Sequence, residues 1–314
     1  MLRSADMLKP RNRRSGVRVV LLAASRDWHV RRLAAAFRRR GIGTTLTRLE
    51  DCDFDTRSPS GLRLRRLREP PDGVIVRTIA AGGFEAITRR LGILHALARL
   101  GVPVWNEATA IERCVDKSTT TFLLTQAGLP VPPSWAVEGI EAARRVVEAV
   151  GTDPPLVLKP LFGSQGRGLV LVRDAGDLPP PEQVGDVYYL QRFVGGNGPD
   201  HRDFRVFVIA GEPVAAMARC GESWITNVRR GGKPMPTPLD RELAEFGAAA
   251  AAAVGASFCG VDILRREDGA SYVLEVNSMP AWSGLQTVTP VDIADILAER
   301  FSAALRTATE RRVA

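Results

Sequence analysis

Short apolar runs and helical repeats alternate over the first hundred residues of the chain. Apolar runs such as residues 17–24 have the length and composition of buried parallel strands. Between the runs, apolar residues recur at helical spacing, as at Val30, Leu33 and Phe37, and this repeat ends at Gly41. The pattern predicts strands at residues 17–24, 44–49, 73–77 and 102–105 and helices at residues 27–40 and 84–100. Such alternation favours a parallel sheet with both faces covered.

The pattern changes beyond residue 110, where strands follow one another with fewer helices between them. Strands are predicted at residues 156–159, 169–172, 188–194, 204–209, 213–218, 260–264 and 271–276, and helices at residues 117–127, 241–254 and 291–305. Runs of strands with separate helices are typical of α+β folds. We therefore predict an α/β protein whose C-terminal part is α+β.

Composition breaks and turn residues divide the chain into four predicted parts. They are a disordered basic leader at residues 1–15, an N-terminal α/β domain at 16–110, a central subdomain with a glycine-rich loop at 111–194, and a C-terminal subdomain at 195–314. Within the N-terminal domain, residues 51–72 contain Gly61 and three prolines and are predicted to form a loop-rich connection.

The composition is that of a globular protein with a substantial core. Hydrophobic residues make up 45% and charged residues 25% of the chain, which excludes a disordered or collagen-like protein. No run reaches the roughly 20 apolar residues that span a bilayer, so we expect a cytoplasmic enzyme without a membrane partner. The four cysteines and three histidines are scattered, which argues against a disulfide framework and a zinc site.

Basic residues are concentrated in the N-terminal part. Residues 1–110 contain 22 Lys and Arg against 10 Asp and Glu, whereas residues 111–314 contain 21 against 25. This surplus suits an acidic partner or a polyanionic substrate, or is a solvated arginine-rich surface. Nucleic-acid binding is not expected, because aromatic residues do not alternate with the basic ones and no recognition motif occurs. Only four of the 43 basic residues are lysines, among them Lys117 and Lys159.

One segment combines a glycine-rich loop with a lysine. Gly163, Gly166 and Gly168 fall within six residues between two predicted strands, and Lys159 precedes them by four residues. Glycines allow a hairpin tip to approach a ligand and to present backbone N–H groups to anionic oxygens. The alternative is an ordinary tight turn.

Two later strands carry polar residues inside apolar sequence. Asp262 lies in the first, and Glu275 and Asn277 lie two residues apart in the second, on the same face. A carboxylate buried in a strand is costly unless it is paired or bound to metal. Three oxygen donors without histidine or sulfur suit Mg²⁺. The alternative is that the carboxylates pair with arginines such as Arg205.

Together these motifs resemble the ATP-grasp superfamily, and more closely the RimK-like carboxylate–amine ligases. Eight elements between about residues 105 and 300 carry the resemblance, in order and at comparable spacing. They are residues 116–117, 157–160, 163–168, 190–194, 203–205, 225–227 with 230–232, 260–264 and 274–277. The resemblance implies an ATP-grasp fold preceded by a parallel-sheet α/β domain.

The resemblance also implies roles for individual residues. ATP-binding positions are Lys117, Lys159, Gly163, Ser164, Gln165, Gly166, Gly168, Gln191, Arg192, Phe193, Val194, Asp203, Ile225, Thr226 and Asn227. Positions facing the reacting carboxylate are Asn227 and Arg230 or Arg229, and Arg205 matches a catalytic arginine on the phosphate side. The ligands of Mg²⁺ or Mn²⁺ are Asp262, Glu275 and Asn277. At Arg192 the family often has glutamate, so only the backbone contacts to adenine carry over there.

The implied reaction is ADP-forming ligation of a carboxylate to an amine through an acyl phosphate. RimK-like enzymes commonly add L-glutamate, and residues 278–286 look most like the subgroup that acts on tetrahydromethanopterin-type coenzymes. Trp282 is then either a stacking platform for a pterin ring or an ordinary buried residue. Alternatives are glutamylation of an acidic ribosomal protein tail, ligation to an amino-group carrier protein in lysine biosynthesis, and a nucleotide-binding module without activity. A homo-oligomer is expected.

Overall fold

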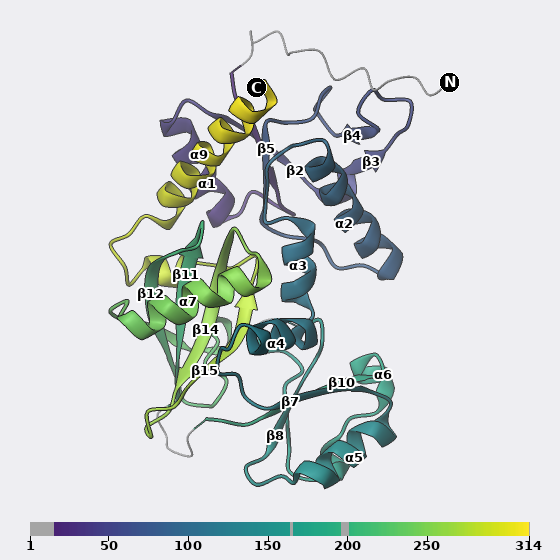
Figure 1. Ribbon diagram of the computed structural model, residues 1–314, viewed down its shortest axis with the longest axis vertical. Coiled ribbons are helices and arrows are strands. Elements are labelled where there is room, and N and C mark those ends of the chain that lie inside the picture. Colours follow the sequence, from purple (N-terminus) through teal and green to yellow (C-terminus); the bar gives the residue numbers. More distant parts are fainter. Residues whose placement is uncertain (1–15, 164–165, 196–200, 314) are drawn as a thin grey trace.

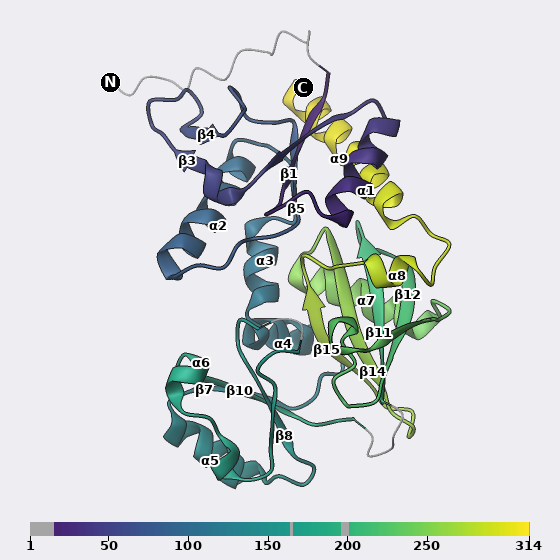
Figure 2. The same cartoon turned by 180° about the vertical axis from the view of Figure 1, so that it is seen from behind.

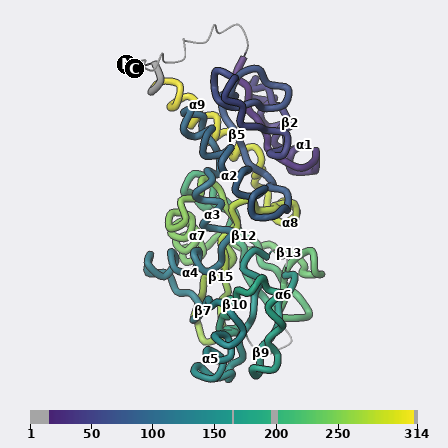
Figure 3. The backbone as a smooth tube through the Cα atoms, turned by 90° about the vertical axis from the view of Figure 1, so that its right-hand side faces the viewer, coloured from purple at the N-terminus to yellow at the C-terminus, as the bar shows by residue number. Residues whose placement is uncertain are grey.

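The computed structural model describes residues 16–163, 166–195 and 201–313 of the chain. The leader predicted at residues 1–15, and Ser164 and Gln165 of the glycine-rich loop, lie outside the described residues. Three larger sheets follow one another along the long axis of the molecule (Figures 1 and 3), and each falls within one of the predicted parts. In the described part of the chain, no helix is both long and apolar enough to cross a bilayer.

The N-terminal sheet is parallel, as predicted. Its strand order is β2 (Gly43–Thr47), β1 (Arg18–Leu22), β5 (Gly73–Val76) and β6 (Val104–Trp105). Alternate residues of β1 face opposite sides: Val19 and Leu21 pack with α1 (Trp28–Arg39), and Val20 and Leu22 pack with α2 (Phe84–Arg99). Both faces are therefore buried, which explains the continuous apolar runs.

The predicted loop-rich connection contains a small hairpin that the sequence analysis missed. After the short turn η1 (Leu49–Asp51), strand β3 (Cys52–Phe54) pairs with β4 (Leu62–Leu64) in an antiparallel two-stranded sheet. Leu62 and Leu64 are buried against the core of the N-terminal domain. Strands of three residues are too short to produce a clear alternating pattern, which is why the three prolines and Gly61 dominated the prediction.

The central sheet is antiparallel, with strand order β7 (Ser134–Glu138), β10 (Val187–Arg192), β8 (Leu156–Lys159) and β9 (Val170–Val172). Helices α5 (Ile140–Val150) and α6 (Pro181–Val184) belong to this part, and the turn η2 (Ala175–Asp177) lies between β9 and α6. Ala143 and Val147 of α5 pack on Leu156 and Leu158 of β8. The prediction missed β7 and α5, although Gly139 and Gly151 bound the helix at its two ends.

The C-terminal sheet is also antiparallel. Its order is β13 (Lys233–Pro236), β12 (Glu212–Gly221), β11 (His201–Ile209), β14 (Phe258–Arg265) and β15 (Ser271–Asn277). Helix α7 (Arg241–Val254), predicted with these bounds, packs its alanines on one face. Helices α3 (Ala108–Val115) and α4 (Lys117–Gln126) precede the central sheet in sequence, and α3 crosses the predicted boundary at residue 110. The turn η3 (Val228–Arg230) precedes β13 in the chain, and helix α8 (Ser283–Gln286) follows β15.

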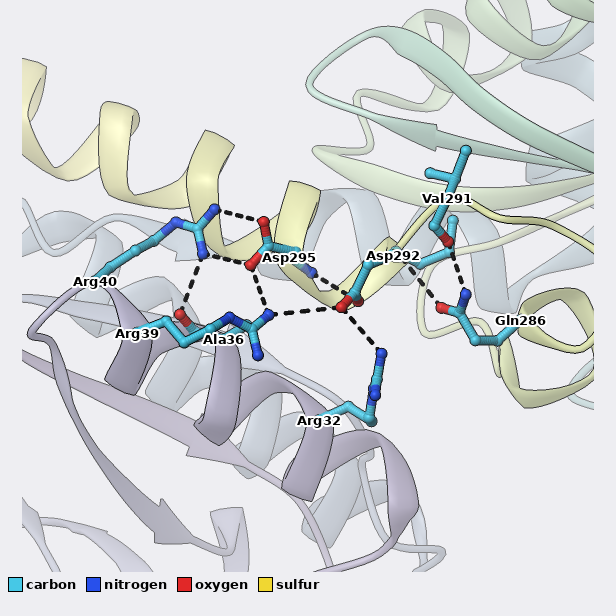
Figure 4. A network of polar contacts seen from close by, with 9 residues as sticks. Arg32, Ala36, Arg39, Arg40, Gln286, Val291, Asp292 and Asp295 are labelled. Carbon is cyan, nitrogen blue, oxygen red and sulfur yellow. Dashed lines mark hydrogen bonds and ion pairs between the residues drawn. The ribbon is translucent and has the colours of Figure 1, made fainter.

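The last helix returns to the N-terminal part of the molecule. Helix α9 (Ile293–Val313) lies beside α1 in both ribbon views (Figures 1 and 2), and Phe301 meets Phe37 edge to face with ring centroids 6.0 Å apart. Figure 4 shows arginines of α1 pointing toward two aspartates at the start of α9. Asp295 accepts hydrogen bonds from Arg39 at 2.6 Å and from Arg40 at 2.6 and 2.8 Å. The C-terminal helix therefore completes the layer that covers the N-terminal sheet.

Candidate active site

Two lysines from separate elements reach the same cleft. Lys117 is the first residue of α4, which begins there because the carboxylate of Asp116 accepts a hydrogen bond from Ser118 N at 2.9 Å. Lys117 Nζ donates to the carbonyl of Gly163 at 2.8 Å. Lys159 ends strand β8, and its Nζ donates to Gln191 Oε1 at 2.6 Å. Both lysines line the cleft between the central and C-terminal sheets.

The environment of Lys159 disfavours its positive charge. Burial lowers the pKa of its amine to about 8, an effect that the carboxylates of Glu275 and Asp262 oppose and the nearby charge of Lys117 reinforces. Its direct partner is a neutral amide oxygen. An anion bound in the cleft would stabilise the charged form of this lysine.

The acidic end of the cleft is built from two paired strands. Asp262 of β14 lies opposite Glu275 of β15 in the antiparallel register, and both residues line the cleft. Asp262 accepts hydrogen bonds at 2.7 Å from Nε and Nη2 of Arg205, and Nη2 of Arg219 lies 3.0 Å from its second oxygen. Burial raises the pKa of Asp262, but these two arginines outweigh that effect and hold the pKa below its usual range. The arginine pairing considered as an alternative is thus present at Asp262.

Arg219 is a site residue that the sequence analysis missed. It stands in β12 directly opposite Asp203 of β11, and its Nε donates to Asp203 at 2.7 Å. The guanidinium is almost wholly buried, and the two aspartates raise its pKa despite that burial. The available signal was an arginine inside the apolar run of β12, which needs a buried partner for the same reason as a buried carboxylate.

The three predicted metal ligands all carry oxygen donors that suit Mg²⁺, but they differ in how free those oxygens are to bind a cation. Glu275 has a carboxylate on the cleft wall, and within residues 16–163, 166–195 and 201–313 this carboxylate forms no hydrogen bond or ion pair. Asn277 Nδ2 lies 3.5 Å from the carbonyl of Gly260, which leaves its amide oxygen for other contacts. Asp262 shares both oxygens with arginines. Two carboxylates and an amide fit a hard cation such as Mg²⁺, with Glu275 the most available donor.

The glycine-rich loop touches the arginine-bearing turn η3. A Cβ atom on Gly166, whose φ is +67°, would lie 2.8 Å from Ile225 Cγ2, so a side chain there would collide with its neighbour. Arg230 Nη2 donates to the carbonyl of Gly166 at 3.0 Å. Asn227 caps the turn by accepting a hydrogen bond from Arg229 N at 3.0 Å. The loop assigned to ATP and the turn whose arginines are assigned to the reacting carboxylate therefore meet.

The predicted adenine hinge, residues 191–194, begins with the last two residues of β10, and its residues point in different directions. Gln191 Nε2 donates to the hydroxyl groups of Ser134 and Tyr189, both at 3.0 Å. Arg192 turns its guanidinium to the end of α5, where it donates to the carbonyls of residues 150, 151 and 154 at 2.6 to 2.9 Å. This is a favourable place for a cation, because the last carbonyls of a helix lack backbone partners. Phe193 meets Trp224 edge to face at 5.8 Å on the cleft wall.

The structure brings most predicted site residues together. Those lining the cleft are Lys117, Lys159, Gly163, Gly166, Gln191, Arg192, Phe193, Val194, Asp203, Ile225, Thr226, Asn227, Asp262 and Glu275. Those outside its lining are Gly168, Arg205, Arg229, Arg230 and Asn277. Arg205 stands behind Asp262, and Arg230 is held at the glycine-rich loop. Their assigned roles remain predictions.

Trp282 is not a stacking platform. Its side chain has no exposed surface, and its ring packs against His29 at a centroid distance of 4.6 Å and Phe207 at 5.7 Å. A ligand ring therefore cannot reach its face. The expectation that Trp282 stacks on a pterin is wrong, and the alternative of an ordinary buried tryptophan is correct.

Comparisons with known proteins agree with this geometry. The RimK-like ATP-grasp domain matches residues 114–301. A tetrahydromethanopterin:alpha-L-glutamate ligase of Methanosarcina acetivorans is 30% identical, with 87% of this chain and 94% of that protein covered, and the ligase of that name from Methanococcus maripaludis is 36% identical over 62% of this chain and 68% of its own. The structure of ATP-grasp ligase PsnB complexed with a phosphomimetic variant of a minimal precursor, Mg and ADP superposes with a TM-score of 0.67 at 23% identity, covering 94% of this chain and 99% of that one. The resemblance and the fold class predicted from the sequence are confirmed.

Proposed function

Because this chain belongs to the RimK-like ATP-grasp family and is an ATP-grasp ligase, we propose that it uses ATP and Mg²⁺ to join L-glutamate to a carboxylate of a tetrahydromethanopterin-type coenzyme. One observation carries the proposal: Lys117, Lys159, Asp262 and Glu275, which are far apart in sequence, line a single cleft. Two amines and two carboxylates around one space match the needs of a nucleotide triphosphate and its cation.

The reaction has two balanced steps. An oxygen of the acceptor carboxylate attacks the γ-phosphorus of ATP, the bond to the β-phosphate oxygen breaks, and ADP leaves. The amine nitrogen of glutamate then attacks the carbonyl carbon of the acyl phosphate, loses a proton, and expels inorganic phosphate as the amide forms. Carboxylates are poor electrophiles, so the first step supplies the leaving group that the second one needs.

Each part of the cleft has a task in this sequence. Lys117 and Lys159 would neutralise phosphate oxygens, and the backbone of the glycine-rich loop would cover them. Residues 191–194 would hold the adenine, beside the aromatic pair of Phe193 and Trp224. Glu275, with Asn277 and Asp262, would hold Mg²⁺, which supplies charge neutralisation on the phosphoryl group when bound. Arg229 or Arg230, next to Asn227, would stabilise the oxyanion formed as the amine attacks.

The names of the most similar relatives support glutamate as the amine and a reduced pterin as the acceptor. The surplus of arginine in residues 1–110 suits a polyanionic coenzyme. An acidic protein tail would satisfy the same charge argument, and it therefore enters the test as a competing acceptor.

The test is ADP release by the purified protein with ATP, Mg²⁺, L-glutamate and one acceptor at a time. We expect ADP and a product heavier by one glutamyl residue, measured by mass spectrometry, with tetrahydromethanopterin and not with an acidic ribosomal peptide. Product with the peptide alone would move the acceptor to a protein tail. If the protein binds ATP but releases no ADP with either acceptor, the proposed ligation is contradicted.

A further inference from the structure

Residues 278–282 connect the end of β15 to helix α8, and three side chains of the N-terminal part bind their backbone. Asn106 Nδ2 donates to the carbonyl of Ser278 at 2.5 Å, and Arg77 Nη2 donates to the carbonyl of Pro280 at 2.8 Å. Trp282 N donates to His29 Nε2 at 3.1 Å. We call His29, Arg77 and Asn106 the backbone clamp. Its members come from α1, the end of β5 and the end of β6.

Asn106 uses all of its hydrogen-bonding capacity in this contact. Besides Ser278, its Nδ2 donates to the carbonyl of Phe258 at 2.7 Å, while its Oδ1 accepts from Ser257 N at 2.6 Å and Phe258 N at 3.1 Å. The side chain has no exposed surface. It therefore ties the start of β14 to the residue that follows Asn277.

Arg77 is a cation in a place that favours apolar residues. Its side chain is 4% exposed, and its guanidinium carbon lies 4.5 Å from the ring centroid of Trp282. Among the described residues, its Nε and Nη1 have no hydrogen-bond partner. Burial lowers the pKa of Arg77 to about 10, opposed by the charge of Asp27. Such a residue is costly to bury, and its hydrogen bond goes to the backbone of Pro280.

His29 joins the clamp only in its neutral form. Nε2 must be unprotonated to accept from Trp282 N, so the proton lies on Nδ1, which is 3.4 Å from Asp27 Oδ2. The charged groups facing the ring are Asp27 before α1, Arg77 after β5 and Arg229 of η3. Burial, with the charge of Arg77, lowers the pKa of His29 below its usual value of 6.5.

The clamped residues link the two halves of the proposed chemistry. One end continues β15, which carries Glu275 and Asn277. The other end enters α8, where a Cβ on Gly284 would lie 3.7 Å from Val228 of η3, the turn that carries Arg229 and Arg230. Movement of residues 278–282 would displace both ends together.

We propose that His29, Arg77 and Asn106 are positioning residues of the ligase, which hold residues 278–282 so that the acidic end of the cleft and turn η3 face the same reacting carboxylate. This inference rests on the proposed function, because it assigns the clamp a part in that reaction. The lysines and the adenine hinge belong to other elements, so loosening the clamp lowers kcat and leaves the KM for ATP nearly unchanged.

The test compares two variants at one position. In His29→Gln an amide oxygen can still accept from Trp282 N but does not titrate, whereas His29→Phe has no acceptor. We expect wild-type kcat to fall in acid, as the pH drops through the lowered pKa of His29 and the ring becomes protonated. His29→Gln should retain near wild-type kcat without that acid limb, and His29→Phe should lose about tenfold in kcat at all pH values. Thermal unfolding shows whether each variant is folded.

A second pair makes the result independent of titration. Arg77→Lys keeps one donor for the carbonyl of Pro280, and Arg77→Met keeps none, so lysine should restore part of the kcat lost with methionine. Suppose that the wild type is active and that His29→Phe and His29→Gln have the same kcat as the wild type and the same loss of kcat in acid. The positioning role would then be overturned, and the proposed function would stand. If the wild type itself ligated no acid to any amine, the proposed function would fail first, and this inference with it.

Discussion

The cleft and the backbone clamp use polar side chains in opposite ways. In the cleft, Lys117 and Lys159 donate to a carbonyl and an amide oxygen, and within the part of the chain that the structure describes neither forms an ion pair. In the clamp, Asn106 has all four of its hydrogen-bonding positions occupied by backbone groups.

The difference separates side chains that are available to bind a ligand from side chains that stabilise the fold. A neutral partner orients a lysine but leaves its charge uncompensated, so a polyanion can replace that partner at little cost. A side chain whose partners are all buried backbone atoms has nothing to offer a ligand. The next three predictions test this division, from the largest expected effect to the smallest.

Lys159→Met should nearly abolish ligation. Removing a cation that faces the developing charge of a phosphoryl group costs about 100- to 1000-fold in kcat. The fold should remain, because Lys159 bonds to one neutral amide. ADP release measures the effect, and Lys233→Met, which changes an exposed lysine outside the cleft, is the matched control. A Lys159 variant as active as this control would remove the lysine from the site.

Arg219→Met should destabilise the protein rather than act on ligand binding alone. It leaves the buried carboxylate of Asp203 without its cation, which costs about 3–5 kcal/mol of unfolding free energy. Urea unfolding measures this, and Arg241→Met at an exposed pair on α7 should change stability by under about 1 kcal/mol. Equal stability of the two variants would mean that the pair of Arg219 and Asp203 does not hold the sheet.

Asp295→Asn should have the smallest effect. Hydrogen bonds from Arg40 and Arg39 lower the pKa of Asp295 and outweigh the opposing effect of burial. A lowered pKa means that the pair stabilises the fold above the unfolded pKa of about 4 and that this stabilisation is lost as the pH falls further. Because Asp295 and its two arginines remain partly exposed to solvent, which screens their charges, the difference from wild type at pH 7 should be under about 1 kcal/mol. Urea unfolding should show that this difference in unfolding free energy shrinks in high salt and at pH 3. A difference that depends on neither salt nor pH would contradict the ion-pair account.

Much of the fold could be predicted because buried faces repeat at the period of their element. Strand β8 and helix α7 were predicted with their observed bounds, since continuous apolar runs and alanine-rich faces give strong signals. The β3–β4 hairpin was missed because strands of three residues carry no period. Helix α9 was predicted, but its place beside α1 depends on tertiary contacts such as that of Phe301 with Phe37.

The candidate site also contains residues that a local pattern predicts and residues whose place depends on tertiary contacts. Lys117, Lys159 and Glu275 stand in motifs whose order along the chain is diagnostic, and the structure places them around one cleft. Arg77 and His29 are single polar residues whose partners are distant in sequence, so no local pattern marked them. Arg219 stood out only as an arginine inside the apolar run of β12. The sequence left two alternatives open for Trp282, because an aromatic residue next to a substrate segment looks the same whether it is exposed or buried.

The most direct test of the ligase account follows the oxygen atom that passes from the acceptor carboxylate to inorganic phosphate. The acceptor carboxylate is labelled with ¹⁸O and incubated with the protein, ATP, Mg²⁺ and L-glutamate, and the released phosphate is examined by ³¹P NMR. Activation through an acyl phosphate predicts one ¹⁸O atom in the phosphate for every amide formed. Unlabelled phosphate, or AMP and pyrophosphate in place of ADP, would contradict the account.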